Sequence, residues 1–150
     1  MTLRKFEEFL RKGIVKKQTP NEQRAQSLLK EAENNEEFFN MSLKLIPKDK
    51  MSYNFIVNSC YDIMMELIRS KMFIDGYNSG SSHEAEVSYL RKLEFSEAEI
   101  TFMDELRYYR NGIKYYGKIL DKEYADNVLQ FMRKILPQLK KLLNHLKEKN

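Results

Sequence analysis

Residues 49–76 read DKMSYNFIVNSCYDIMMELIRSKMFIDG, and this stretch decides the fold. Pro47 restricts the residue before it and Asp49 can cap a helix, so both favour a helix start at this point. The pair Asp75-Gly76 is typical of a helix end. Between them lies a run of large apolar side chains that includes Phe55, Ile56, Ile63, Met64, Leu67 and Ile68. The stretch therefore predicts a long and largely apolar helix.

The residues before this helix predict another long one. Thr19 offers a capping hydroxyl, Pro20 stands where a missing N–H costs nothing, and Glu22 follows at the third helical position. We expect this first long helix to begin near Asn21 and to run to about Ile46.

The residues after Gly76 begin with a predicted loop at 77–82. A capping box of Ser81 with Glu84 then predicts a short helix to about Leu93.

The last third of the chain predicts two further helices. A capping box of Ser96 with Glu99 opens one that runs toward Tyr116-Gly117, and Asp121 can cap the other. Pro137 should kink the last helix because it removes one backbone hydrogen bond. Apolar residues in that helix recur at helical spacing: Val128, Met132, Ile135, Leu139, Leu142 and Leu146.

Strand-forming residues are scarce, with only 4 Val and 3 Thr in 150 residues. The predicted fold class is therefore all-α: an up-down bundle of about five main helices with a short N-terminal helix. We expect a basic N-terminal segment over residues 1–20 and the bundle over residues 21–150.

Composition narrows the class of protein. The chain is 42% hydrophobic and 32% charged, which excludes collagen-like and wholly disordered proteins. No apolar run approaches the length of a membrane span, so we expect a cytoplasmic protein with no membrane partner. Cys60 is alone and only His83 and His145 accompany it, so we expect no disulfide, no metal site and no cofactor.

The net charge of +4 is unevenly distributed. Residues 1–20 carry six basic and two acidic side chains, and residues 133–149 carry six basic and one acidic, so both ends are basic and the middle is acidic. Two interpretations stay open: lysines on solvated helix faces, and a surface that attracts RNA or another polyanion.

Arg110 breaks the apolar pattern of its helix. It projects close to the middle of a face formed by Phe102, Met103, Leu106 and Ile113. Because an arginine stays charged, an inward guanidinium needs a carboxylate, a phosphate or a water-filled cleft. Glu36, among the apolar residues of the first long helix, is one candidate counter-ion, and Asp62 is a competing one. The alternative to a binding site is therefore an internal ion pair that has only a structural role.

The stretch around Arg110, residues 106–118, reads LRYYRNGIKYYGK. Its four tyrosines could stack on bases, or they could be residues at the edge of the core with wet hydroxyls. Gly112 destabilises a helix interior, which indicates close approach of another backbone or of a ligand.

The order of these elements resembles the HEPN domain family. The likeness spans residues 21–146. It is carried by residues 24–32 (RAQSLLKEA), residues 53–61 (YNFIVNSCY), a short helix over 83–90, and the Arg110-Asn111 pair near the end of the penultimate helix. HEPN domains are small helical bundles that commonly form homodimers. Many are metal-independent ribonucleases or partners of minimal nucleotidyltransferases in toxin–antitoxin pairs.

The resemblance implies a degenerate catalytic motif. The family motif is an arginine followed, after four to six residues, by histidine, and Arg110 matches its first half. Tyr115, Tyr116 and Gly117 occupy the positions where histidine would stand. Tyrosine is a poor proton shuttle at neutral pH, so efficient RNA cleavage is not expected. We interpret His83 and His145 as surface residues.

The leading hypothesis is a HEPN-like homodimer that binds nucleotide or RNA phosphate around Arg110 without efficient ribonuclease activity. Asn111 would orient Arg110 or bind the phosphate, Lys114 would add charge, and Tyr115 or Tyr116 would stack. One alternative is a metal-independent, toxin-like ribonuclease that uses Arg110 with Lys114 or Tyr115. Another is a helical interaction module that partners a nucleotidyltransferase. A polar strip on the second long helix could line the dimer contact: Asn54, Asn58, Asp62 and Arg69.

Overall fold

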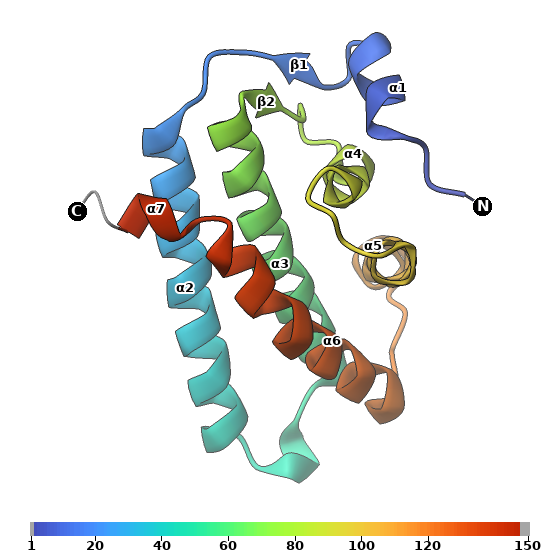
Figure 1. Cartoon of the computed structure of the whole chain (residues 1–150). Coiled ribbons are helices and arrows are strands. Elements are labelled where there is room, and N and C mark those ends of the chain that lie inside the picture. The colour runs from blue at the N-terminus through green and yellow to red at the C-terminus, as the bar shows by residue number, and fades with distance from the viewer. Residues whose placement is uncertain (1, 148–150) are drawn as a thin grey trace.

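Helix α3 (Tyr53–Asp75) is the centre of the fold in the computed structural model, which describes residues 2–147. It contacts α2 (Glu22–Leu45), α4 (His83–Ser88), α5 (Glu97–Tyr116) and α6 (Lys122–Lys141). In Figure 1, α2 and α3 run antiparallel, α6 crosses in front of α3, and α4 and α5 are seen end-on. The predicted all-α class is confirmed.

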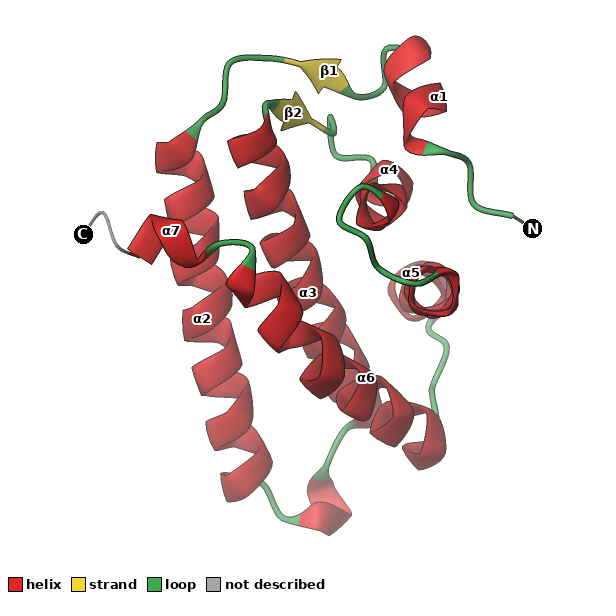
Figure 2. Cartoon of the chain, viewed as in Figure 1, coloured by secondary structure: helices red, strands yellow, loops and turns green. Residues whose placement is uncertain are grey.

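The remaining elements are short. They are α1 (Phe6–Arg11), α7 (Asn144–Lys147), two 3-10 turns (Lys48–Lys50 and Tyr89–Arg91), and the two-residue strands β1 (Lys16–Lys17) and β2 (Tyr77–Asn78). Figure 2 shows the two strands in yellow among the helices and loops of the described chain.

Three of the predicted N-cap residues are wrong, by one to three positions. Asn21, instead of Thr19, caps α2, and its Oδ1 accepts the backbone N–H of Arg24 at 3.0 Å. Ser52, instead of Asp49, caps α3, because Asp49 lies within a 3-10 turn. A cap must directly precede the first helical residue, and the polar residues nearest to each helix take that position.

The third error is at α4, where Ser82 instead of Ser81 is the cap. The Ser82 hydroxyl accepts the backbone N–H of Ala85 at 3.2 Å. Ser81 has a φ of 74°, the left-handed conformation, whereas an N-cap residue is extended.

Four other predicted boundaries are confirmed. Ser96 and Glu99 form a reciprocal capping box, and Asp121 accepts the backbone N–H of Tyr124. Gly76 and Gly117 end α3 and α5 in the left-handed conformation.

Two helices end earlier than predicted. The short helix was expected to reach about Leu93, but α4 ends at Ser88 and a 3-10 turn follows it. The last helix ends at Lys141, so Leu146 belongs to α7. Pro137 lies inside α6, and the kink expected there stays a prediction.

The segment 77–82 is not entirely a loop, because β2 pairs antiparallel with β1. Gly76 makes this pairing possible, since a Cβ there would lie 2.7 Å from the carbonyl oxygen of Gln18. The ladder ties the N-terminal segment to the end of α3.

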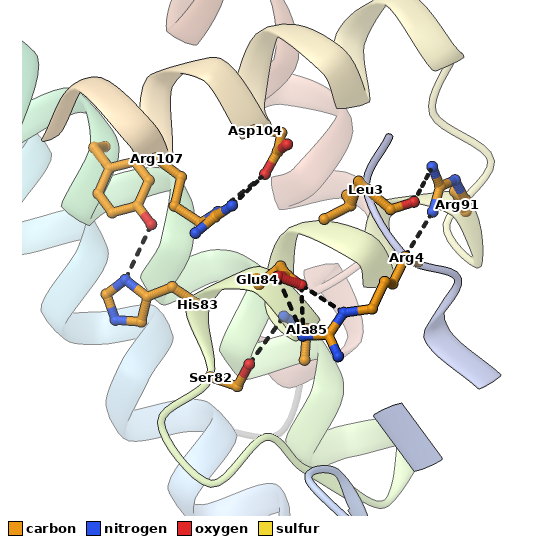
Figure 3. Close-up of polar contacts among 10 residues, drawn as sticks. Leu3, Arg4, Ser82, His83, Glu84, Ala85, Arg91, Asp104 and Arg107 are labelled. Atoms are coloured by element: carbon orange, nitrogen blue, oxygen red, sulfur yellow. Dashed lines mark hydrogen bonds and ion pairs between the residues drawn. The ribbon is translucent and has the colours of Figure 1, made fainter. Parts of the chain in front are cut away.

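The basic N-terminal segment packs into the same core as the bundle. Leu3, Phe6, Phe9 and Val15 are buried in that core. Figure 3 shows how the segment is held: the Arg4 guanidinium donates to Glu84 of α4, and Arg91 donates to the carbonyl oxygens of Leu3 and Arg4. These contacts hold the segment against α4.

Candidate phosphate site

Arg110 faces the central helix. The buried Met103 and Leu106 fix the inner face of α5, and Arg110 projects from the same face toward α3. Its side chain is 17% exposed, and its guanidinium carbon lies 5.6 Å from the ring centroid of the buried Tyr61. The inward orientation expected from helical spacing is therefore present.

The carboxylate beside Arg110 belongs to Asp62. The distance from Arg110 Nη2 to Asp62 Oδ1 is 3.3 Å. The alternative that Glu36 is the counter-ion is wrong, because Glu36 forms an ion pair with Lys140 of α6. Glu36 lies on the side of α2 that faces α6, where a lysine reaches it first.

The Arg110–Asp62 pair leaves most of the guanidinium unused. A guanidinium has five N–H donors, and within residues 2–147 Arg110 uses one of them. Asp62 is 51% exposed, and such exposed ion pairs contribute about 0–1 kcal/mol. An external anion can therefore compete with Asp62 for Arg110.

His83 is the residue that the sequence interpretation missed. It is the first residue of α4, as expected, but it is half-buried, and its Nδ1 lies 3.0 Å from the Tyr61 hydroxyl, a contact drawn in Figure 3. Arg110 and His83 thus contact the same tyrosine. In the sequence they are 27 positions apart, so no short motif could indicate this contact.

The environment of His83 favours its neutral form. Burial is the largest cause that lowers the pKa of His83, and the nearby charges of Arg69 and Arg110 lower it further. The carboxylates of Glu86 and Asp62 oppose this shift. Burial likewise raises the pKa of Tyr61, so its hydroxyl remains protonated.

A buried ion pair holds α4 against α3. Glu86 is fully buried, and it accepts hydrogen bonds from Arg69 at 2.6 and 3.0 Å and from the Ser79 hydroxyl at 2.7 Å. Because Glu86 is one helical turn from His83, this network also positions the imidazole.

The polar strip expected on α3 is used within the chain. Arg69 and Asp62 make the contacts above, and the Asn54 amide binds the carbonyl oxygen of Lys118 and the N–H of Leu120. Only Asn58 has an amide oxygen that is buried and has no hydrogen-bond partner among the described residues. Three of these four side chains therefore have partners within the chain, and a dimer contact along the strip stays a prediction.

The other predicted binding residues lie on a different face of α5. Asn111, Tyr115 and Tyr116 line a hollow of about 380 Å³ together with Tyr108, Tyr109, Gly112 and Lys118. Tyr115 and Tyr116 are 67% and 86% exposed. We call this hollow the tyrosine hollow. Sequence proximity suggested one cluster of binding residues around Arg110. The turn of the helix instead places Arg110 on one face and the residues of the tyrosine hollow on another.

Lysines border the tyrosine hollow. The Lys118 ammonium lies 4.6 Å from the ring centroid of Tyr109, and the exposed Lys114 ammonium lies 5.5 Å from that of Tyr115. A Cβ at Gly112 would lie 3.5 Å from the Lys118 side chain, which is ordinary van der Waals contact, so the close approach of another backbone expected at Gly112 is absent from the described residues. Tyr109 packs against Tyr124 at the core edge, so the core-edge interpretation holds for Tyr109 but not for Tyr115 or Tyr116.

Cysteine and metal chemistry have no assembled site in the described residues. Cys60 is buried, and burial raises the pKa of its thiol to about 12. Within residues 2–147, His, Cys, Asp and Glu side chains form no group of three that could hold a metal ion.

Comparison with protein-family models, curated proteins and solved structures finds no match to this chain. No helix over residues 2–147 has the length and apolar character needed to span a bilayer.

Proposed function

We propose that this HEPN-like chain binds a phosphate group of RNA or of a nucleotide at Arg110, without efficient ribonuclease activity. One observation carries the proposal: the Arg110 side chain is 17% exposed, yet its guanidinium has a single 3.3 Å contact with an exposed carboxylate. A guanidinium with unused donors binds phosphate oxygens well, because its planar fork matches their geometry.

His83 supplies a second donor to the same phosphate. The Tyr61 hydroxyl and His83 Nδ1 lie 3.0 Å apart, and we propose the tautomer in which the hydroxyl donates to Nδ1. In a neutral imidazole the proton then resides on Nε2, which becomes a donor. A neutral His83 therefore suits phosphate binding better than proton abstraction, which requires a ring nitrogen with a free lone pair.

The tyrosine hollow gives the site a preference for RNA over a single nucleotide. Tyr115 and Tyr116 are exposed enough to stack on bases, Asn111 offers amide hydrogen bonds, and Lys114 adds charge. Base stacking on an aromatic residue contributes about 1–3 kcal/mol per base. A strand that continues from the phosphate at Arg110 would gain this stabilisation.

The test is RNA binding by fluorescence anisotropy in EDTA, comparing wild type with Arg110→Gln. Removal of the guanidinium should weaken binding by about tenfold or more, since one charge-assisted contact is worth about 1.5–3 kcal/mol. The matched control is Arg24→Gln, which removes an exposed arginine that also stacks on a phenylalanine ring. Equal affinities of wild type and Arg110→Gln would contradict the proposal.

A metal-independent ribonuclease is the second candidate, and His83 is the observation that favours it. Such a reaction would need the other tautomer of His83, in which Nδ1–H donates to the Tyr61 oxygen and Nε2 has a free lone pair. Nε2 would accept the proton of the 2′-hydroxyl as that oxygen attacks the adjacent phosphorus, and would return a proton to the departing 5′-oxygen. Lys114 and Tyr115, the donors expected from the sequence, are both exposed, whereas His83 shares Tyr61 with Arg110. Cleavage in EDTA that both Arg110→Ala and His83→Ala abolish would establish this candidate and replace the binding-only proposal.

The resemblance also supports two proposals about partners: we propose that the chain is a homodimer and that a minimal nucleotidyltransferase is a partner. We further propose a cytoplasmic location. Co-expression with an adjacent nucleotidyltransferase gene, followed by affinity purification, tests the nucleotidyltransferase partner. If the chain were only an interaction module, Arg110→Ala would lower stability and leave RNA binding unchanged.

A further inference from the structure

Helix α2 has an apolar stripe that no part of the described chain covers. Phe38, Met41 and Leu45 are 68%, 52% and 75% exposed. They stand at positions i, i+3 and i+7, so they share one helix face. The opposite face of α2 carries its buried residues Ala25, Leu29, Ala32 and Phe39. An exposed patch of a few hundred Å² of this kind is typical of an interaction surface.

A hollow lies on each side of the stripe. One, of about 250 Å³, is lined by Phe38 together with Phe39, Phe55, Asp62 and Ile63. The other, of about 460 Å³, is lined by Met41 with neighbouring polar residues of α2. A ridge between two grooves is the shape that packs against the ridge of another helix.

The charges around the stripe are polarised along the helix. Among the exposed charges of residues 30–50, Lys30, Glu31 and Glu37 lie on the N-terminal side of the centre of the stripe, and one positive and two negative charges give a net charge of −1. On the C-terminal side, Lys44 of α2 is followed by Lys48, Asp49 and Lys50 of the next 3-10 turn, and three positive charges and one negative charge give a net charge of +2. None of these seven exposed residues forms an ion pair within residues 2–147, whereas the acids that face the C-terminal helices do: Glu33 pairs with Lys147 and Glu36 with Lys140.

This polarity selects both the partner and its direction. A second α2 laid antiparallel across the stripe brings the acidic half of each helix against the basic half of the other. A parallel arrangement would place acid against acid and lysine against lysine. A two-fold symmetric contact repeats each favourable pair twice.

We propose that a second copy of this chain docks on the stripe through its own α2, antiparallel, with the two-fold axis between Phe38 and Met41. This α2–α2 contact specifies the surface of the homodimer, and it rests on the proposal above that the chain is a homodimer. Because Asp62 lines the hollow beside Phe38, the second copy forms a wall next to the counter-ion of Arg110.

The first test is sedimentation equilibrium of the full chain at micromolar concentration. The wild type should be a dimer, and Phe38→Glu should weaken dimerisation by about a hundredfold, the effect expected from charging a central apolar contact. Tyr108→Glu is the control, because Tyr108 is 71% exposed on α5, which lies on the other side of α3 from α2 (Figure 1). Circular dichroism confirms that both variants fold.

The second test exchanges charges across the interface. Glu37→Lys and Lys44→Glu should each weaken the dimer, and the double variant should restore it, because the pair forms between two copies. In addition, Met41→Cys should form an intermolecular disulfide on oxidation, since Cys60 is buried and cannot compete.

The outcomes separate this inference from the proposals it builds on. A monomeric wild type would overturn the stripe and the homodimer together. A dimer that Phe38→Glu leaves intact would overturn the stripe and keep the homodimer. Phosphate binding is judged separately, by the effect of Arg110→Gln on RNA affinity in the same preparations.

Discussion

The inner and outer sides of the C-terminal end of α5 differ in how closely their residues are tied to the rest of the chain. On the inner side, Arg110 lies against Tyr61 and Asp62, and a buried network next to it holds His83. On the outer side, Tyr115 and Tyr116 are exposed around the tyrosine hollow. Arg110 and Asn111 are neighbours in sequence, yet a rotation of about 100° places them on different faces.

This difference separates two kinds of contribution. The inner side is tied to the core, so its residues affect stability as well as binding. The outer side has few internal partners, so its residues can change binding alone. Variants of each side should therefore produce different patterns of effects.

The largest expected effect is on the inner side, in the variant Glu86→Ala. It leaves the guanidinium of Arg69 without its buried partner, and breaking such a pair costs about 3 kcal/mol. Urea denaturation measures the loss. Tyr116→Ala, which removes an 86% exposed side chain, is the comparison on the outer side and should change the free energy of unfolding by about 0.5 kcal/mol or less. Similar losses for the two variants would remove the distinction between the sides.

The next effect concerns the outer side and depends on the ligand. The double variant Tyr115→Ala and Tyr116→Ala should weaken binding of an RNA oligonucleotide by about tenfold, because stacking is lost. Binding of a mononucleotide should not change, since its phosphate needs only the inner side. Anisotropy and calorimetric titrations test the two ligands. Equal losses for both ligands would mean that the two sides form a single site.

A smaller effect sharpens the role of Asp62. Asp62→Asn removes the carboxylate that competes for Arg110, so RNA should bind about two- to fivefold more tightly, within the range expected for an exposed ion pair. Stability should fall by less than about 1 kcal/mol. Weaker RNA binding by this variant would instead assign Asp62 a direct role in holding the ligand.

The smallest effect is the pH dependence from His83. Its pKa is lowered in the folded protein, so below the ordinary value of about 6.5 the unfolded chain binds more protons. The stability contributed by a neutral His83 is therefore present above about pH 6.5 and is lost as the pH falls below it. Denaturation at a series of pH values should show that the free energy of unfolding falls less steeply below pH 6.5 for His83→Gln than for wild type. His145→Gln is the control, because it removes an exposed imidazole on α7, away from Tyr61.

Local rules predicted most of the fold. The Ser96 box, the Asp121 cap and the left-handed Gly76 and Gly117 are each decided by neighbouring residues, and the structure has them as expected. Errors arose where two polar residues competed for one cap, as Ser81 and Ser82 do. The β1–β2 ladder was missed because its strands are only two residues long and are distant in sequence.

The site was predicted less completely. Helical spacing located Arg110 on the inner face, and Asp62 was one of its two candidate partners. His83 was missed because its contact with Tyr61 depends on how α4 packs on α3, which the buried Glu86 determines. A glutamate and an arginine buried within the same core leave no periodic signal in the sequence.

The most direct test of the central claim is the NMR signal of the Arg110 side chain during titration with a short RNA oligonucleotide. The Nε–Hε resonance, assigned by its absence in Arg110→Gln, reports on the guanidinium alone. The proposed site predicts that this resonance shifts and saturates as RNA is added, and that it shifts further at equal RNA in Asp62→Asn. An unchanged Arg110 resonance at saturating RNA would contradict the claim that this guanidinium binds phosphate.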